Sequence, residues 1–306
     1  MTKHQPVLVP EVLRVLTPNR GESYFDATAG YGGHASAILE RIGDGGRVVL
    51  NDRDNEATKH LEQLFGDRAQ IMRTSFEEAT DRLVEDGERF DVILLDLGIS
   101  SPQVDTPERG FSFRLNGPLD MRMDRQQSLT AEQVINEYSE TKLADIIYQY
   151  GEERFARRVA RAIVAARPIK STGQLAEIVR KAVPKSGDID PATRTFQAIR
   201  IEVNDELGQL EQTLPQLVKL LAIGGRLAVI SFHSLEDRIV KQFLDHESRD
   251  CICPPKQPIC TCDHLATLAK LTRSAIKGTE DSNNPRARSA KLRAAVRIKT
   301  KTKGGA

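Results

Sequence analysis

The stretch Asp26-Ala-Thr-Ala-Gly30-Tyr-Gly32-Gly33-His34 follows a short apolar run and holds three glycines within four residues. A second stretch, Asp96-Leu-Gly-Ile-Ser-Ser-Pro-Gln103, also follows an apolar run. Glycine lets a chain turn tightly from a strand into a helix, and lets the backbone approach a ligand closely. Both stretches therefore predict turns at the carboxyl ends of parallel strands, where open α/β sheets bind their ligands.

Apolar, strand-like runs recur at helical intervals along the chain, which predicts an α/β fold with a parallel sheet and right-handed crossovers. We expect strands at residues 23–26, 47–52, 69–72, 90–96 and 226–231, with helices at 34–42, 55–65, 75–85 and 235–246. Residues 292–298 alternate weakly and are expected to form an edge strand.

The long segment between the fourth and fifth strands has a different pattern. Apolar positions recur at helical spacing in residues 131–138, 143–150, 155–166 and 175–183, and Thr130-Ala-Glu-Gln133 forms a capping box. We expect a domain formed by residues 1–110 and 213–306, interrupted by an all-helical insertion at 111–212 that would recognise the substrate. The alternative is one large α/β domain with long loops.

The charges of the chain are unevenly distributed. Of its 306 residues, 28% are charged, and residues 284–306 hold eight basic residues and no acidic one. The rest of the chain has 36 basic against 43 acidic residues, so a basic tail follows an acidic body. Such a tail favours a polyanionic partner, although a solvated terminus is the alternative. The absence of a long apolar run or a signal peptide predicts a cytoplasmic protein with no membrane partner.

Four carboxylates, Asp26, Asp52, Asp54 and Asp96, are expected near the strand ends. They would repel a pyrophosphate but suit hydroxyls, an amine or a cation. S-adenosylmethionine carries ribose hydroxyls, an ammonium and a sulfonium, so the pattern predicts methyl transfer. Asp52 lies 22 residues after Gly30, where an acid ending the second strand binds ribose hydroxyls. A helix N-cap is the alternative role for Asp52.

Asp96 can hold the methionine ammonium, the adenine amine or the amine that is methylated. The segment Ser100-Ser101-Pro102-Gln103 would place backbone carbonyls beside the transferring methyl, and an ordinary turn is its alternative. Phe76, just past the third strand, could stack on adenine, although its residue type taken alone favours a core position.

Several longer strings resemble one family, the bacterial ribosomal RNA small subunit methyltransferase H family. They are Gly32-Gly-His34, Asp96 to Gln103, Arg109-Gly-Phe-Ser-Phe113, Gly117-Pro-Leu-Asp-Met-Arg-Met-Asp124, Tyr150-Gly-Glu-Glu153, Pro191-Ala-Thr-Arg-Thr-Phe-Gln197, Ser231-Phe-His-Ser-Leu-Glu-Asp-Arg238 and Asn284-Pro-Arg-Ala-Arg-Ser289. The resemblance implies a Rossmann-like, S-adenosylmethionine-dependent methyltransferase domain interrupted by a helical one. It also implies transfer to the exocyclic N4 of a cytosine in 16S rRNA, near the decoding centre of the small ribosomal subunit.

The resemblance implies a cofactor site at Gly32, Gly33, His34, Asp52, Phe76, Asp96 and Gln103. His34 and Gln103 rest on it alone, and Asp96 is also the catalytic candidate. Arginines in loops or near the tail are candidate phosphate contacts, with surface ion pairs as the alternative: Arg109, Arg114, Arg122, Arg194, Arg286 and Arg288. His233 would contact the target nucleotide or belong to a capping turn with Ser234 as the cap.

All four cysteines lie within residues 251–262, as two Cys-x-Cys pairs. Their clustering argues against a disulfide framework in a chain without an export signal. They could hold zinc, although the usual interval between zinc ligands is longer, and a loop of reduced thiols is the alternative.

Two other functions remain open from the residues. Gly30, Gly32 and Ala35 also fit a dinucleotide fingerprint, which would indicate a dehydrogenase. A non-catalytic ribosome-assembly factor could use the same fold to bind RNA. The sequence does not indicate an oligomeric state.

Overall fold

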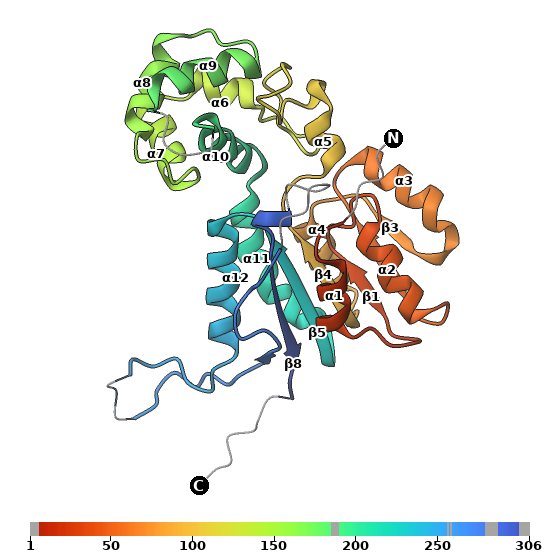
Figure 1. The fold of residues 1–306 in the computed structure, drawn as a ribbon. Coiled ribbons are helices and arrows are strands. Elements are labelled where there is room, and N and C mark those ends of the chain that lie inside the picture. Colours follow the sequence, from red (N-terminus) through yellow and green to blue (C-terminus); the bar gives the residue numbers. More distant parts are fainter. Residues whose placement is uncertain (1–5, 185–189, 256, 258, 279–286, 300–306) are drawn as a thin grey trace. The chain divides into compact units, whose positions relative to one another are not determined.

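The computed structural model describes residues 6–184, 190–255, 257, 259–278 and 287–299 (Figure 1). The chain divides into two compact units, which are described separately. Unit 1 consists of Met1–Gly98 and Gly208–Ala306, and unit 2 consists of Ile99–Leu207.

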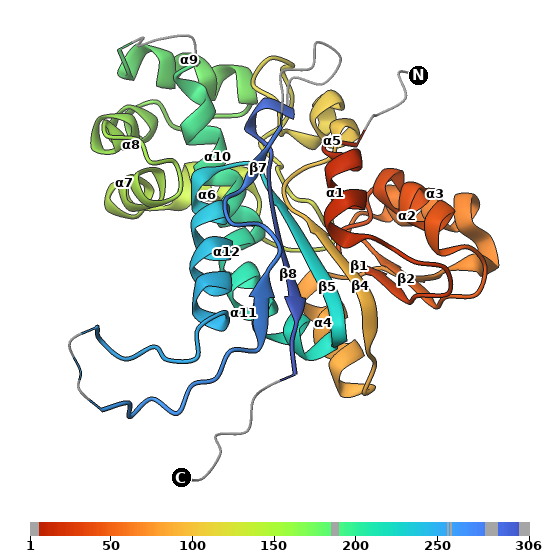
Figure 2. The same cartoon turned by 60° about the horizontal axis from the view of Figure 1, so that its bottom comes forward.

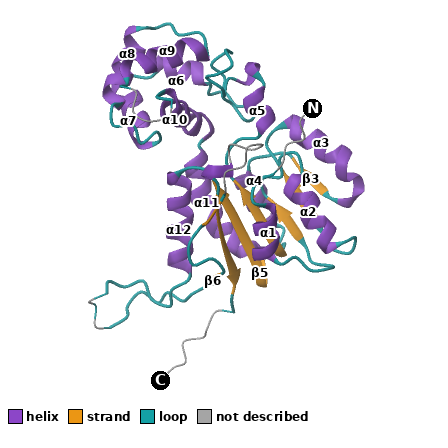
Figure 3. Cartoon of the chain, viewed as in Figure 1, coloured by secondary structure: helices purple, strands orange, loops and turns teal. Residues whose placement is uncertain are grey.

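Unit 1 is built on a sheet whose described residues form eight strands in the order β3-β2-β1-β4-β5-β8-β6, with β7 paired to β8 (Figure 3). The strands from β1 to β5 pair in parallel, and β8 runs antiparallel to β5, β6 and β7. Their bounds are β1 (Tyr24–Asp26), β2 (Val48–Asn51), β3 (Gln70–Met72), β4 (Phe90–Asp96), β5 (Leu221–Ser231), β6 (Leu268–Lys270), β7 (Ile276–Lys277) and β8 (Lys291–Arg297). The predicted mixed α/β fold with a mostly parallel sheet is confirmed.

Helices cover both faces of this sheet (Figure 2). Successive residues of a strand point to opposite faces, so Leu94 packs with one set of helices and Leu95 with the other. The first set is α1 (Val9–Leu16), α2 (Gly33–Ile42) and α3 (Asn55–Phe65), and the second is α4 (Phe76–Glu85), α11 (Glu206–Leu220) and α12 (Ser234–Glu247). Burial of both faces explains why β4 is apolar at nearly every position.

The prediction for the C-terminal part of the sheet was wrong in two respects. β5 begins at Leu221 rather than 226, because Leu221 pairs with Phe90 before a register shift that ends where Arg226 pairs with Val92. β8 is not an edge strand, since β5 lies on one side and β6 and β7 on the other. β6 and β7 have three and two residues, too few to show alternation in the sequence.

Unit 2 has its own apolar core, in which helices pack with the loop that precedes them. Phe111, Leu119 and Met121 of this loop are buried against the helices, so the unit begins at Ile99 rather than at the expected 111. Its helices are α5 (Ser101–Asp105), α6 (Ala131–Glu137), α7 (Glu140–Gln149), α8 (Ala156–Ala165), α9 (Thr172–Ala182) and α10 (Ala192–Asn204).

Short 3-10 turns occur in both units, at η1 (Gly66–Arg68) and η3 (Ala287–Ser289) in unit 1 and at η2 (Pro107–Arg109) in unit 2. Among the described helices of the chain, none has the length and apolar content needed to cross a bilayer.

Gly32 offers a test of the turn between β1 and α2. It adopts a φ of +79°, and a Cβ added there would lie 2.8 Å from Phe65 Cε2. Gly32→Ala should lower the free energy of unfolding by about 2–4 kcal/mol, from left-handed strain plus the overlap. Gly87→Ala is the matched control, with a φ of +73° and nothing within 4 Å of the added Cβ; it should cost about 1–2 kcal/mol. Urea unfolding of both variants measures the difference, and equal losses would contradict the packing account.

Candidate functional site at the carboxyl ends of the strands

The register of the sheet brings the carboxyl ends of the parallel strands to one edge. Asp26, the last residue of β1, pairs with Leu50 of β2 and with Leu94 of β4. Asp52 and Asp96 follow within two residues of these partners, on the neighbouring strands. The predicted gathering of strand-end carboxylates is therefore present within unit 1.

Asp26 is the most deeply buried of these groups, with 1% of the residue exposed. The Tyr24 hydroxyl donates to Asp26 Oδ2 at 2.6 Å, and the Thr28 amide donates to Oδ1 at 3.2 Å. Burial raises the pKa of Asp26 to about 7, and the Asp52 carboxylate adds to that effect, although these hydrogen bonds oppose it. Near neutral pH, Asp26 is thus close to half protonated.

Asp52 holds the loop after β1 against the end of β2. Its Oδ2 accepts from the Gly30 amide at 2.9 Å, and its Oδ1 accepts from the Asp54 amide at 2.8 Å. Burial raises the pKa of Asp52 despite both bonds. The N-cap of α3 is Asp54, whose side chain accepts from the Glu56 amide, so the capping role does not belong to Asp52.

Asp96 pairs with the first helix after the glycine turn. Its Oδ2 lies 3.4 Å from His34 Nδ1, and its amide donates to Thr28 Oγ1 at 2.6 Å. The side chain is 24% exposed, but Oδ1 is buried and has no hydrogen-bond partner among the described residues. Burial, together with the carboxylates of Asp26 and Glu236, raises the pKa of Asp96 well above its usual range.

His34 contacts the backbone through one ring nitrogen and Asp96 through the other. His34 Nε2 lies 2.8 Å from the carbonyl oxygen of Val7, and a carbonyl only accepts, so Nε2 carries a hydrogen. Nδ1 then faces the Asp96 carboxyl group, 3.4 Å from Oδ2. The pair orients the Asp96 carboxyl group and leaves Oδ1 for another donor.

The glycine turn leaves room for a ligand beside these carboxylates. A Cβ at Gly30 would meet nothing within 4 Å, whereas one at Gly33 would meet the ring of Pro6 at 2.8 Å. Gly32 caps α2 without a side-chain hydrogen bond to the first amides of the helix. Amides in the first turn of a helix are donors for an anionic group.

Comparison with known proteins assigns the chain to a family. The model of the MraW methylase family matches residues 1–298. The chain belongs to the MraW methylase family. It is 51% identical over 308 residues to a ribosomal RNA small subunit methyltransferase H of Syntrophotalea carbinolica, covering 97% of this chain and 98% of the relative. It is 46% identical over 309 residues to the enzyme of that name from Heliobacterium modesticaldum, covering 97% and 99%. The resemblance found in the sequence is confirmed, and the chain is a methylase.

Phe76 and Gln103 have local structural roles in this methylase. Phe76 begins α4 and is 8% exposed within the core on that face of the sheet. Gln103 belongs to unit 2, where its side chain accepts from the Ser100 amide at 3.1 Å in a capping box at α5.

Two of the candidate arginines hold the loop of unit 2 together. Arg109 Nη2 donates to the carbonyl oxygens of Arg122 and Met123 at 3.1 and 2.9 Å. Arg122 binds the Asp120 carboxylate through Nε and Nη2 at 2.7 and 3.0 Å. Guanidinium groups used in this way are poor candidates for phosphate contacts, so we do not retain these two.

Other candidate substrate residues are more exposed to solvent. Arg114 and Arg288 are exposed, and Arg194, with a side chain 49% exposed, lies 3.6 Å from Glu153. Arg286 lies outside the described residues. Two basic residues of the tail form ion pairs within unit 1, because Lys291 and Arg293 both bind Asp237, at 3.1 and 2.7 Å.

His233 is the N-cap of α12, so the expected cap at Ser234 was wrong. The Glu236 amide donates to His233 Nδ1 at 3.5 Å, and Glu236 Oε2 accepts from the amides of Phe232 and His233 at 2.8 and 3.2 Å. Sequence reasoning missed Glu236, although its position three residues after the cap is the signal of a capping box.

Two further contributors, Thr28 and Asn51, were also missed. The Asn51 side chain donates to the carbonyls of Ala27 and Thr74 at 3.0 and 3.2 Å, which ties three strand ends together. Their positions beside the strand-end aspartates were the available signal.

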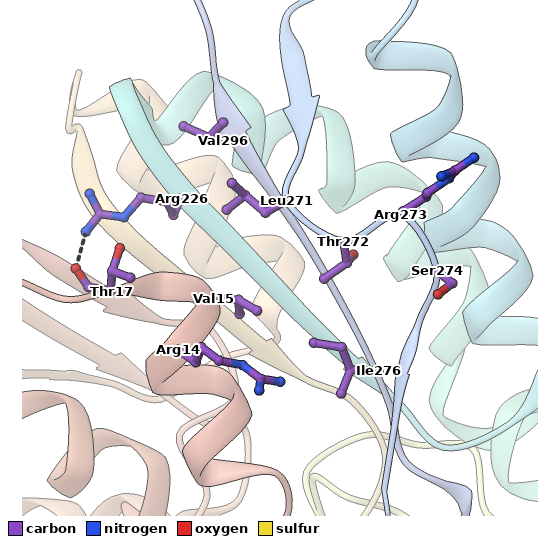
Figure 4. Close-up of a pocket in the computed structure, with 10 residues that line it drawn as sticks. All are labelled: Arg14, Val15, Thr17, Arg226, Leu271, Thr272, Arg273, Ser274, Ile276 and Val296. Atoms are coloured by element: carbon purple, nitrogen blue, oxygen red, sulfur yellow. Dashed lines mark hydrogen bonds between the residues drawn. The ribbon is translucent and has the colours of Figure 1, made fainter.

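A cavity of about 500 Å³ opens elsewhere on unit 1 and includes none of the strand-end carboxylates (Figure 4). Its most deeply set cation, Arg226, donates to the Leu16 carbonyl at 2.7 Å and pairs with Glu22. Figure 4 shows it turned toward Thr17, the end of α1. This cavity therefore lies where α1 packs on the sheet.

The pKa of Asp26 predicts a pH dependence of stability. An unperturbed Asp has a pKa of about 3.9, so between pH 4 and about 7 the folded protein keeps a proton that the unfolded chain has lost. Asp26 therefore makes the free energy of unfolding fall as pH rises across this window, by up to about 1.4 kcal/mol per unit. Asp26→Asn should remove this part of the slope in urea titrations, while Asp44→Asn, at an exposed carboxylate, should run parallel to the wild type. A pH-independent difference between Asp26→Asn and wild type would contradict the assignment.

Proposed function

We propose that this methylase transfers a methyl group from S-adenosylmethionine to the exocyclic N4 of a cytosine in 16S rRNA. The family description and the name shared by the relatives support an rRNA substrate. The strand-end carboxylates support a donor that carries hydroxyls and positive charge.

The observation that carries the proposal is the buried Oδ1 of Asp96, which has no hydrogen-bond partner in the part of the chain that the structure describes. A buried acceptor without a donor costs about 1–3 kcal/mol, so this atom favours a ligand that brings an N–H group or a positive charge. A cation beside it would also lower the pKa of Asp96 and so restore the carboxylate. A pyrophosphate would gain neither effect, which disfavours a dehydrogenase.

The residues of unit 1 fit S-adenosylmethionine in detail. Asp52 would accept hydrogen bonds from the ribose hydroxyls, and the first turn of α2, which begins at Gly33, would bind the methionine carboxylate. His34 would hold the Asp96 carboxyl group in place, and Phe76 would border the adenine. The bound donor supplies an electrophilic methyl group. Gln103 belongs to unit 2, and we limit the proposed cofactor set to unit 1.

Asp96 is also the proposed catalytic residue. The lone pair of an exocyclic amine is delocalised into its ring, so the amine needs an acceptor that draws its hydrogen away as the new bond forms. Asp96 would provide this acceptor in its carboxylate form, which the positive charge of the bound donor favours, and would receive the proton that the amine must lose. Orientation of the amine and exclusion of water would supply much of the remaining acceleration.

RNA would be bound mainly through its phosphates. We propose that the exposed Arg114, Arg194 and Arg288 contribute, and that unit 2 takes part in substrate recognition. The target base must be unstacked, because an exocyclic amine within a paired stack cannot reach a protein pocket.

The central prediction concerns Asp96. Asp96→Ala should lower methyl transfer to small subunits from a strain lacking the enzyme by at least about 100-fold, since a positioned proton acceptor contributes about 10²–10⁴. The readout is N4-methylcytosine in digested 16S rRNA, by mass spectrometry. Asp44→Ala should keep full activity, and circular dichroism should show both variants folded. Full activity of a folded Asp96→Ala, or a different methylated nucleoside in the wild-type reaction, would overturn the proposal.

Asp52 and Asp54 allow a matched test of the cofactor site. Asp52→Asn should weaken S-adenosylmethionine binding by about 10–100-fold, the loss of hydrogen bonds to a charged group. Asp54→Asn should leave affinity unchanged, because asparagine caps a helix as well as aspartate. Calorimetry measures both, with NAD as the competing ligand. Equal affinities of the Asp52→Asn variant and wild type, or tighter binding of NAD, would exclude the proposed site.

A further inference from the structure

We propose that the cysteine loop of unit 1 is a structural zinc site in which Cys251, Cys253, Cys260 and Cys262 are the four ligands. The four sulfur atoms lie within 4.8 Å of one another. The loop joins α12 to β6 and extends away from the sheet (Figures 1 and 2). The site is independent of the methyl-transfer chemistry proposed above.

Three sulfur–sulfur distances are close to those of a tetrahedral zinc site, and Cys253 Sγ lies within 4.8 Å of the other three sulfurs. Cys251 lies 3.5 Å from Cys260 and 3.9 Å from Cys262, and Cys260 lies 3.6 Å from Cys262. Four sulfurs at about 2.3 Å from a central zinc would be about 3.8 Å apart. These distances are too long for disulfides, whose sulfurs are about 2.05 Å apart, and the cysteines are free.

The backbone around the sulfurs is arranged to support thiolates. The two Cys-x-Cys segments run side by side, with the Ile252 amide 3.4 Å from Cys262 Sγ and the Thr261 amide 3.5 Å from Cys253 Sγ. Each of these bonds links one segment to the other. Amide donors to sulfur stabilise its negative charge, and such outer contacts fix the ligands of metal sites.

No apolar core accounts for the gathering of the four thiols. Among the described residues from 251 to 265 none is buried, and Ile252 and Ile259 are 40% and 73% exposed. Four sulfurs brought this close would repel one another once ionised, whereas a dication would neutralise much of their charge. A metal would thus supply the attraction that burial supplies elsewhere in the fold.

The base of the loop is closed independently of the sulfurs. The Thr267 amide donates to the Glu247 carbonyl at 2.9 Å, and His264 Nε2 lies 3.1 Å from the His246 carbonyl. His246, Glu247 and His264 form a second group of possible ligands. However, Glu247 already accepts from Thr267 Oγ1 at 2.5 Å and lies 3.0 Å from His246 Nδ1. These contacts assign that group to closing the loop and the sulfurs to the metal.

The set of ligands determines the metal and its role. Four thiolates in tetrahedral geometry select zinc or iron. The chain has no cysteines beyond these four, and we propose that the metal is zinc. With four protein ligands the zinc has no open position, so its role is structural rather than catalytic. It would hold the two Cys-x-Cys segments in one conformation.

The test is the metal content of the full chain, purified in reductant without chelator or a metal-binding tag. Plasma mass spectrometry should find one zinc per chain in the wild type and at least tenfold less in the Cys260→Ser, Cys262→Ser double variant. Thr261→Ser lies between the mutated positions, keeps its backbone amide and should retain the zinc. His264→Ala should retain it as well. Cobalt exchanged into the wild type should show the sulfur-to-metal charge-transfer band and the ligand-field bands of tetrahedral thiolate coordination.

Several results would overturn the zinc site. They are a wild-type protein that stays metal-free after incubation with zinc, stoichiometric iron, disulfides found by intact-mass analysis, or zinc lost in His264→Ala but kept in the double variant. Circular dichroism and S-adenosylmethionine binding report whether the double variant is folded. Proteolysis within residues 247–267 gives a second readout on the wild type alone, because a bound metal should slow cleavage at least tenfold relative to chelator-treated protein.

Discussion

The cost of holding carboxyl groups away from water is the constraint on which the site depends. Asp26, Asp52 and Asp96 lie at one edge of the sheet, and burial raises the pKa of each. A buried charge must be paired or lose its charge. The three carboxyl groups differ in how many of their oxygens receive a hydrogen bond or an ion pair from the described residues. We expect a ligand to be favoured where this compensation is smallest.

Asp26 and Asp52 are satisfied internally on both oxygens, by Tyr24 and Thr28 in one case and by the Gly30 and Asp54 amides in the other. Within the described residues, Asp96 receives support from His34 on Oδ2, and Oδ1 has no hydrogen-bond partner. The fold thus leaves the least compensated carboxyl group beside an open glycine turn. A cationic or amine-bearing ligand gains most at that point, because it supplies the partner that the described residues do not give to Oδ1.

The sequence predicted the backbone of this site well and its side-chain contacts unevenly. Runs of apolar residues ending in aspartate placed β1, β2 and β4 correctly, because a strand buried on both faces leaves a continuous signal. His34 could be found only through the family resemblance, since nothing in its spacing shows that Nδ1 faces Asp96. Arg109 and Arg122 show the opposite difficulty. A guanidinium in a loop looks free in sequence, and only the folded loop shows that carbonyls and Asp120 occupy it.

The cysteine loop shows why spacing along the chain is an incomplete guide to a metal site. The usual interval describes two ligands from one turn of backbone, whereas coordination depends on distances between sulfur atoms. Here the amide of Ile252 reaches Cys262 and that of Thr261 reaches Cys253, so ligands are brought together across two segments. A short Cys-x-Cys interval within each segment is then no obstacle, because each segment needs to supply only two corners of the tetrahedron. The hydrogen bonds between Glu247 and Thr267 close the base of the loop without involving the sulfurs.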